Sequence, residues 1–299
     1  MLNRGKEMIC ISDKWKDYEL IATGNQEKTE RWGNVILKRP DPQCIWPYTS
    51  KDKITPNGVY TRTNTGDGSW QWNKSTPEKW QISYNQLKFY IEPSSFKHTG
   101  LFPEQAYNWE FLMDKIEKEY SKDPARNIKV LNLFAYTGAA TLACAYAKAS
   151  VCHVDASKKM VTRAKENAHL SGLKDADIRY IVDDVIKFVK REISRNHKYD
   201  IIIMDPPSYG RGPKGEMWQV EESIYSLVEQ CTSILSDNPI AFLINSYASD
   251  ISITSMKNIL NMTVGSVYDG ETSAYELGLM QSDGKIVLPC GYTARWESK

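Results

Sequence analysis

Apolar and polar positions follow a regular alternation along most of this chain. From residue 129 onward, short apolar runs such as 201–204 alternate with longer stretches in which apolar residues recur every three or four positions. The first pattern is typical of buried strands and the second of helices, so the order predicts a parallel sheet with helices on both faces. The predicted elements are strand 129–134, helix 138–149, strand 151–155, helix 157–171, strand 178–182, helix 184–195, strand 199–204, helix 219–235, strand 240–245 and helix 252–261.

The first 92 residues lack this alternation. Short runs such as 34–38 and 80–84 are bounded there by turn residues, for example Asn57-Gly58. This is typical of hairpins and predicts a small β-rich N-terminal domain over residues 1–92, followed by an α/β domain over residues 93–299. Six of the nine tryptophans lie in the first domain, at positions 15, 32, 46, 70, 72 and 80. We expect them to fill its core, and the alternative is a surface that stacks RNA bases.

Two further elements flank the alternating region. Pro103 predicts the start of a helix that runs to about residue 120, because proline suits the first helical position and apolar residues then recur at helical spacing. Near the end of the chain, residues 275–280 and 285–288 surround a Ser-Asp-Gly turn, which predicts a hairpin.

Composition and charge exclude several classes of protein. The net charge is +1, which is no global signature of nucleic-acid binding. No apolar run approaches the ~20 residues that span a membrane, and the first residues lack the apolar core of a signal peptide. We therefore expect a cytoplasmic protein without membrane contact. The six cysteines form no C-x-x-C pair, so we expect neither a disulfide framework nor a metal site.

The turn Phe134-Ala135-Tyr136-Thr137-Gly138 follows the first predicted strand of the alternating region. A turn at this place presents backbone N–H groups to a ligand, although its single glycine does not fit the nicotinamide fingerprint G-x-G-x-x-G. Asp155 follows Gly138 by 17 residues, at the end of the next strand, where a carboxylate can accept ribose hydroxyls. Together they predict a site for an adenosine cofactor. The alternative for Gly138 alone is a glycine that begins a helix.

Two adjacent acids, Asp183 and Asp184, end the third predicted strand. A carboxylate here can accept the exocyclic amine of adenine, while the backbone N–H of Val185 reaches a ring nitrogen. The alternative is an N-cap for the helix over residues 184–195. Because there are two acids, both roles can be filled.

A stiff segment, Asp205-Pro206-Pro207-Ser208-Tyr209, follows the strand at 199–204. Parallel sheets bind ligands at the carboxyl ends of their strands, so Asp205 is expected to point into the cofactor crevice. Asp205 and the Pro206 carbonyl can accept N–H bonds from a base, and Tyr209 can stack on it. A flipped-out base fits this arrangement, and an ordinary turn is the alternative.

The loop Gly210–Trp218 comes directly after this segment and contains three glycines and the cations Arg211 and Lys214. Flexibility and positive charge suit a lid over a polyanionic substrate. A solvated loop is the alternative.

Several motifs together resemble class I S-adenosylmethionine-dependent methyltransferases, specifically the ribosomal RNA large-subunit methyltransferase I-like family. They are Leu131–Gly138, His153–Ser157, Lys165–Asn167 and Asp205–Tyr209, and Lys97–Gln105 resembles the Lys-Thr-Gly…Gln element of the same family. The resemblance covers residues 89–260 and implies a Rossmann-like fold, with a mostly parallel seven-stranded sheet whose last strand is antiparallel.

The same resemblance implies a cofactor and its contacts. S-adenosylmethionine is the methyl donor and S-adenosylhomocysteine (SAH) the product. The turn of Phe134, Tyr136, Thr137 and Gly138 borders the methionine part, and Thr99 covers it from above. Asn167 ties a helix to this turn. The remaining implied contacts are Asp155 to the ribose, Ala156 and Ser157 to the adenosine, Asp184 and Val185 to the adenine, and Asp205 at the crevice.

Two departures from the family concern the substrate. Residues 1–92 do not resemble the RNA-binding PUA domain that is common there, and Ser246 stands where the 5-methylcytosine members have a catalytic cysteine. Among the cysteines of this chain, Cys290 is the one that a terminal strand could bring near the crevice.

We predict a methyltransferase that acts on RNA, with ribosomal RNA favoured, at a nitrogen of a flipped-out base. The predicted catalytic residues are Asp205, Pro206, Pro207 and Tyr209. The alternatives are methylation of a small molecule or a protein side chain, and a non-catalytic module that binds the cofactor. The sequence does not indicate an oligomeric state.

Overall fold

A computed structural model describes residues 9–48, 54–62, 68–94, 97–211, 215, 217–247 and 251–299. The chain forms two compact units. The α/β unit contains the described residues Ile9 and Cys10 together with Asn108–Leu277 and Gly291–Lys299, and the β unit contains Ile11–Tyr107 and Gly278–Cys290. The predicted domain boundary between residues 92 and 93 falls inside the β unit's first segment and stays a prediction.

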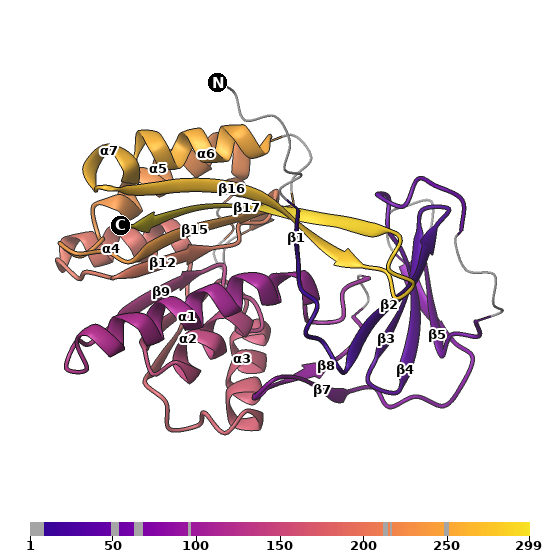
Figure 1. The fold of residues 1–299 in the computed structure, drawn as a ribbon. Coiled ribbons are helices and arrows are strands. Elements are labelled where there is room, and N and C mark those ends of the chain that lie inside the picture. Colours follow the sequence, from indigo (N-terminus) through magenta and orange to yellow (C-terminus); the bar gives the residue numbers. More distant parts are fainter. Residues whose placement is uncertain are drawn as a thin grey trace. The chain divides into compact units, whose positions relative to one another are not determined.

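The α/β unit is built on a large mixed sheet, which confirms the Rossmann-like fold (Figure 1). Within the described residues it has eight strands, in the order β1-β16-β17-β15-β12-β9-β10-β11. The five strands β9, β10, β11, β12 and β15 run parallel, and β17 is antiparallel to β15. The strand that the sequence did not predict is β1, at the edge. The bounds are β1 Ile9–Ile11, β9 Lys129–Leu133, β10 Ser150–Asp155, β11 Ile178–Val182, β12 Ile201–Met204, β15 Ala241–Ser246, β16 Gly270–Met280 and β17 Val287–Ser298.

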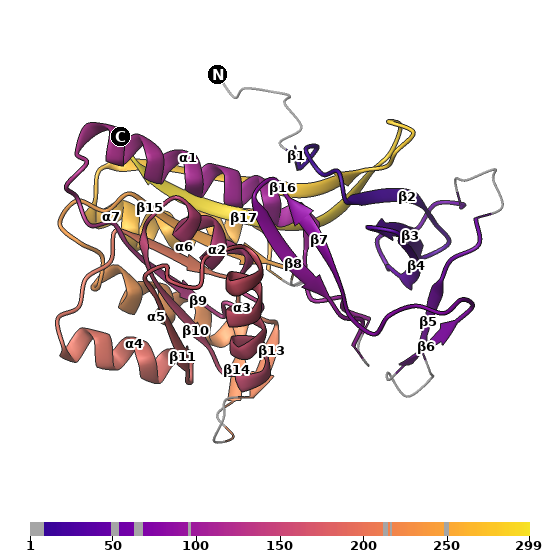
Figure 2. The ribbon, with the colours of Figure 1, turned by 90° about the horizontal axis from the view of Figure 1, so that it is seen from below.

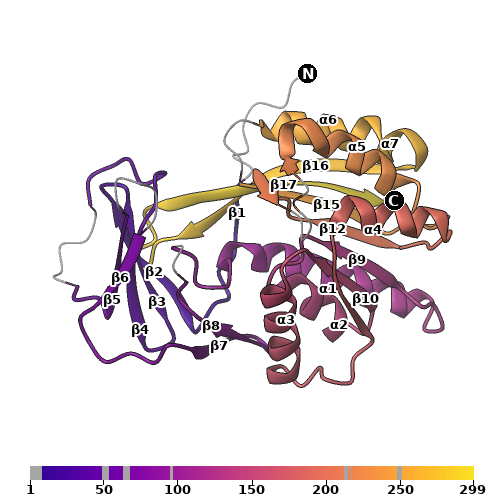
Figure 3. The same cartoon turned by 180° about the vertical axis from the view of Figure 1, so that it is seen from behind.

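Helices cover both faces of this sheet, as Figures 1 and 3 show. Residues within a strand alternate between the faces, so Val130 belongs to an apolar cluster with residues of α1 and α2, whereas its neighbour Leu131 belongs to a cluster with residues of α4, α5 and α6. Apolar strand residues thus face a helical layer on each side, which explains the continuous apolar runs in the sequence. The bounds are a 3₁₀ turn at Pro103–Gln105, α1 Ala106–Lys122, α2 Ala139–Tyr146, α3 Lys158–Leu170, α4 Val185–Ser194, α5 Val220–Thr232, α6 Ile253–Met262 and α7 Val264–Val267.

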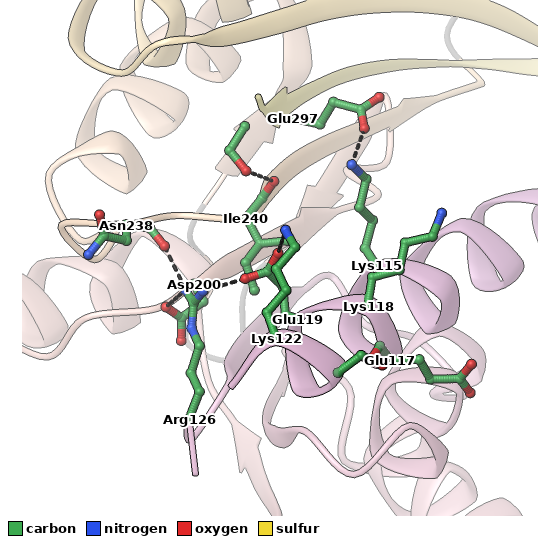
Figure 4. Close-up of polar contacts among 12 residues, drawn as sticks. Lys115, Glu117, Lys118, Glu119, Lys122, Arg126, Asp200, Asn238, Ile240 and Glu297 are labelled. Carbon is green, nitrogen blue, oxygen red and sulfur yellow. Dashed lines mark hydrogen bonds and ion pairs between the residues drawn. The ribbon is translucent and has the colours of Figure 1, made fainter. Parts of the chain in front are cut away.

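Ionic contacts close the amino edge of the sheet, where the parallel strands begin (Figure 4). The Arg126 guanidinium donates to Glu119 at 2.7 Å and to Asp200 at 2.9 Å. The second Asp200 oxygen accepts the backbone N–H of Lys129 at 2.9 Å. Because Glu119 lies on α1 and Asp200 precedes β12, these bonds fix the last turn of α1 to the start of the central strands.

The β unit has a five-stranded sheet in the order β2-β3-β4-β5-β6 and a separate hairpin of β7 and β8. The turn between β2 and β3 places Asn25 and Gln26 at φ +52° and +62°, which matches the twist of a tight hairpin. The bounds are β2 Tyr18–Gly24, β3 Glu27–Trp32, β4 Val35–Pro40, β5 Gly58–Arg62, β6 Gly68–Trp72, β7 Trp80–Tyr84 and β8 Leu87–Ile91. This confirms the β-rich character of the N-terminal region.

The tryptophans of the β unit do not share one environment. Trp32 is fully buried, whereas Trp72 keeps 43% of its surface exposed and stacks on Trp70. Trp32 therefore fills the core as expected, whereas Trp72 does not. Across the residues described, no helix has both the length and the apolar character to span a membrane.

The chain segment after residue 277 completes the β unit. The Thr23 hydroxyl donates to the side-chain oxygen of Gln281 at 2.8 Å, and the Ser282 N–H donates to the Leu20 carbonyl at 2.9 Å. The β unit is therefore built from two segments that lie far apart in the sequence.

Candidate active site

The turn after β9 has an unusual backbone. Phe134, Tyr136 and Gly138 have φ values of +53°, +50° and +85°. Non-glycine residues rarely adopt this left-handed region, which costs about 1–2 kcal/mol per residue. Gly138 also permits close packing, since an added Cβ would lie 2.8 Å from the Cβ of Ala164 on α3. Strained backbone of this kind concentrates at functional sites, where the surrounding structure enforces it.

Asp155 enforces the shape of this turn. One carboxylate oxygen accepts the Tyr136 N–H at 2.8 Å, and the other accepts the Ser157 N–H at 2.8 Å. Burial raises the pKa of the Asp155 carboxyl, and the two backbone N–H bonds act in the opposite direction. Each carboxylate oxygen has a further lone pair, so Asp155 can hold the turn and accept ligand hydroxyls at once.

A buried polar chain forms the floor beneath the turn. The Asn132 side chain donates to the Thr141 hydroxyl at 3.0 Å, and that hydroxyl lies 2.9 Å from Nδ1 of His153. Burial lowers the pKa of His153 to about 3, which keeps the imidazole neutral. On the other side, the Asn167 amide donates to the Thr137 carbonyl at 3.0 Å. This bond ties α3 to the turn, as the sequence analysis expected of Asn167.

Both acids at the end of β11 have protein partners. Asp183 forms a close ion pair with Arg191, and its backbone N–H donates to the Asp155 carbonyl at 3.1 Å. Asp184 accepts the Lys187 N–H at 2.9 Å and caps α4. The N-cap alternative therefore holds for Asp184, and a contact with adenine remains a prediction. Val185 is buried as the first residue of α4.

The two residues after Asp155 also start a helix. Ser157 is the N-cap of α3, and its hydroxyl accepts the Met160 N–H at 3.4 Å. Ala156 is half-buried between them. The structure thus brings Asp155, Ala156 and Ser157 together beside the turn.

The segment Asp205–Tyr209 begins directly after β12. The Asp205 N–H donates to the carbonyl of Leu133, the last residue of β9, at 3.4 Å. This places Asp205 next to the turn that begins at Phe134. Pro206 is buried and Pro207 is exposed, whereas Tyr209 keeps 49% of its surface exposed. The segment therefore offers an aromatic ring to solvent beside the strained turn.

The sequence analysis treated Gly210–Trp218 as a loop, but its described ends form a hairpin (Figure 2). Strand β13, Tyr209–Arg211, pairs antiparallel with β14, Met217–Gln219. The Tyr209 hydroxyl lies 3.2 Å from the Met217 sulfur. Lys214, which the lid hypothesis included, lies outside the described residues.

Trp218 is the site residue that sequence reasoning missed. Its indole N–H donates to the Pro207 carbonyl at 2.7 Å, and its ring packs on Phe134 with centroids 4.9 Å apart. A tryptophan at the end of a glycine-rich loop was the available signal, because such a large apolar ring seldom stays in solvent.

Burial disfavours the reactive thiolate form of Cys144, Cys152, Cys231 and Cys290. Burial raises the pKa of the Cys144 and Cys231 thiols, and it raises that of Cys152 to about 11. Burial and the Glu104 carboxylate also raise the pKa of Cys290 well above its ordinary value. Ser246, at the end of β15, is buried.

Thr99 belongs to the β unit, unlike the other predicted cofactor residues. It is buried, and among the described residues its hydroxyl has no hydrogen-bond partner. Its role over the methionine part stays a prediction. No group of three potential metal ligands occurs in the part of the chain that the structure describes.

Comparison with known proteins places these features in a family. A family model described as S-adenosylmethionine-dependent methyltransferase matches residues 56–224, more than half of the chain. The solved S-adenosylmethionine-dependent methyltransferase from Agrobacterium tumefaciens is 35% identical, with a TM-score of 0.90, and the match covers 100% of this chain and 98% of that one.

More distant proteins share parts of the chain. SMU.776, solved in complex with SAH, shows a likeness of fold, with a TM-score of 0.73 at 20% identity over 95% of this chain and 76% of that one. The ribosomal RNA large subunit methyltransferase K/L of Shewanella frigidimarina is 29% identical over 76% of this chain and 31% of its own length. The protein of the same name from Shewanella woodyi is 30% identical over 87% of this chain and 35% of its own. The chain thus spans about a third of the length of these curated relatives.

Proposed function

Because the chain belongs to the S-adenosylmethionine-dependent methyltransferase family, we propose that it methylates RNA, with ribosomal RNA as the favoured substrate, at a nitrogen of a flipped-out base. The observation that carries this proposal is the bond from the Asp205 N–H to the carbonyl of Leu133, which holds the proposed acceptor segment, Asp205–Tyr209, beside the residue that directly precedes the strained turn. The matched proteins named ribosomal RNA methyltransferases support RNA as the substrate.

The residues around the turn suit the donor. The left-handed turn from Phe134 to Gly138 would border the methionine part, and the spare lone pairs of Asp155 suit the ribose hydroxyls. Thr99, Ala156, Ser157, Asp184 and Val185 are the further proposed contacts. The bound donor supplies an electrophilic methyl group on a sulfonium.

The acceptor segment positions the nucleophile. Asp205 and the Pro206 carbonyl would accept N–H bonds from the base, and the exposed ring of Tyr209 would stack on it. Such positioning of a lone pair in line with the methyl group supplies much of the rate enhancement. As the new nitrogen–carbon bond forms, the carbon–sulfur bond breaks with its electron pair going to sulfur, and the nitrogen's proton passes to Asp205 or to water.

The thiol environment supports nitrogen over C5 of cytosine. C5 becomes nucleophilic after a thiolate adds at C6, and burial raises the pKa of Cys144, Cys152, Cys231 and Cys290. A covalent complex with RNA that contains 5-fluorocytosine, lost on replacement of one cysteine, would contradict the proposal for nitrogen.

Nucleoside mass spectrometry of RNA tests the substrate. We expect one methylated nucleoside to be absent from the ribosomal RNA of cells that lack the protein, and to reappear when that RNA is incubated with purified protein and S-adenosylmethionine. The Asp205→Asn variant, matched in size, is the control, and over the same incubation it should restore far less of the methylated nucleoside. Identical nucleosides in both RNA samples would exclude ribosomal RNA and favour a small-molecule or protein substrate. Binding of SAH with no transfer to any acceptor would favour a non-catalytic module.

A further inference from the structure

One side chain contacts both halves of the candidate site. Trp218 is 94% buried, since only 6% of its surface is exposed, and it belongs to the short strand β14. Its ring lies against Phe134 at a tilt of 53°, and its N–H ends on the Pro207 carbonyl. Phe134 opens the turn proposed for the cofactor, and Pro207 belongs to the segment proposed for the acceptor.

The surrounding hairpin holds this indole firmly. Trp218 pairs with Gly210 in the hairpin, and the N–H of Val220, two residues after it, donates to the Ser208 carbonyl at 3.1 Å. Gly210 itself has little room, because an added Cβ would lie 3.4 Å from Pro207 and 3.8 Å from Trp218. The carbonyls of Pro207 and Ser208 are therefore held in place by Trp218 and Val220, respectively.

We propose that Trp218 is a positioning residue that couples cofactor binding to the conformation of the acceptor segment. The proposal rests on the proposed function of this site. A ligand that orders the Phe134 turn restrains the ring of Trp218, and the indole N–H passes this restraint to the Pro207 carbonyl. Coupling between two sites is reciprocal, so an acceptor held by the Asp205 segment also strengthens cofactor binding.

Trp218→Phe separates the two contacts, because it keeps an aromatic ring beside Phe134 and removes the N–H donor. Trp296→Phe is the matched control. Trp296 is also buried, and its indole N–H has no partner among the described residues, so the same atoms are removed without loss of a hydrogen bond. Thermal unfolding of both variants identifies any general loss of stability.

Hydrogen exchange measures the coupling without any methyl acceptor. We expect saturating SAH to slow exchange in peptides covering residues 205–211 and 217–220 about fivefold in the wild type and in Trp296→Phe, and to leave them unchanged in Trp218→Phe. Equal slowing in all three proteins, or no slowing in the wild type, would overturn the proposal. If Trp218→Phe does not fold, Phe134→Leu removes the ring contact from the other side. Unchanged exchange in this variant at saturating SAH would support the proposal, and slowing equal to that of the wild type would overturn it.

Single-turnover methylation adds a second measurement. With ribosomal RNA from cells lacking the protein, Trp218→Phe should lower the transfer rate about tenfold, the effect of one hydrogen bond, with SAH affinity close to that of the wild type. An unchanged rate, or a parallel loss of SAH affinity, would contradict a positioning role. If the wild type transfers no methyl group, the proposed substrate is wrong, while the exchange experiment still decides whether Trp218 couples the two segments.

Discussion

Strand β12 is flanked by an aspartate at each end, and the two lie in contrasting surroundings. Asp200, at the amino edge, is buried, and its carboxylate accepts bonds from Arg126, Lys129 and Ser236. Asp205, at the carboxyl edge, is half-buried beside left-handed backbone and an exposed tyrosine. One edge of the sheet uses its polar groups to fix the fold, and the other carries the strained turn at which we propose that a ligand binds. Mutations at the two edges should therefore separate stability from activity.

The largest effect is expected at the carboxyl edge. Asp205→Asn should lower the single-turnover rate about 100-fold, because it removes a charged acceptor that orients the base. SAH affinity, measured by calorimetry on the same protein, should fall much less. A wild-type rate in this variant would show that Asp205 does not orient the acceptor. The proposed difference between Asp205, which serves activity, and Asp200, which serves stability, would then be wrong.

Asp155→Ala tests the cofactor side of the same edge. Loss of charge-assisted bonds to the ribose should weaken SAH binding about 30-fold, and the melting temperature should also fall, because the Tyr136 and Ser157 N–H groups lose their acceptor. Calorimetry and thermal unfolding measure the two effects. Unchanged SAH affinity would show that Asp155 is only a structural residue of the turn.

At the amino edge, Arg126→Ala should lower stability without changing SAH affinity. It removes bonds to Glu119, Asp200 and the Asn238 carbonyl, and should lower the free energy of unfolding by about 2 kcal/mol. Urea unfolding gives this value, and SAH affinity should stay at the wild-type level. Lys118→Ala, which removes an exposed pair on α1, is the control that should change neither quantity. A loss of SAH affinity in Arg126→Ala would show that the two edges are not independent.

His153 predicts a smaller, pH-dependent effect beneath the turn. Burial holds its pKa at about 3 in the folded protein, below the ordinary value of 6.5, so the unfolded chain takes up a proton first. This contribution to stability is fully present well above pH 6.5 and is lost as the pH falls toward 3, with a total loss of about 1.4 kcal/mol by pH 5.5. Urea unfolding at pH 7.5, 6.5 and 5.5 should show this loss, and His153→Asn should reduce it. If the free energy of unfolding of His153→Asn falls with pH as steeply as that of the wild type, the acid sensitivity comes from other groups.

The sheet and its helices could be predicted from the sequence because each buried strand appears as an apolar run. Each helix appears as a stretch in which apolar residues recur every three or four positions. Strand β12 was expected at 199–204 and lies at Ile201–Met204, and helix α5 was expected at 219–235 and lies at Val220–Thr232. These patterns are local, because they depend only on which positions within a short segment are apolar. The positions of the Phe134–Gly138 turn and of Asp205 at strand ends then predicted the candidate site, and the family resemblance implied the cofactor.

What the sequence did not predict depends on distant partners. The hairpin of β13 and β14 has three residues in each strand and much glycine, so its pattern matches a loop. Its stability comes from Trp218, whose partners Phe134 and Pro207 are set by the fold and not by spacing. Likewise, Asp184 follows both an N-cap pattern and a ligand pattern, and the structure is what shows the cap.

The closing segment of the β unit also sets an order of events during synthesis. Gln281 and Ser282 bond to Thr23 and Leu20 within that unit. As the chain leaves the ribosome, residues 11–107 are available long before residues 278–290 have been made. The β unit therefore waits until residues 278–290 have been made before its last strand contacts can form, and β17 of the α/β unit, which ends at Ser298, is completed later still.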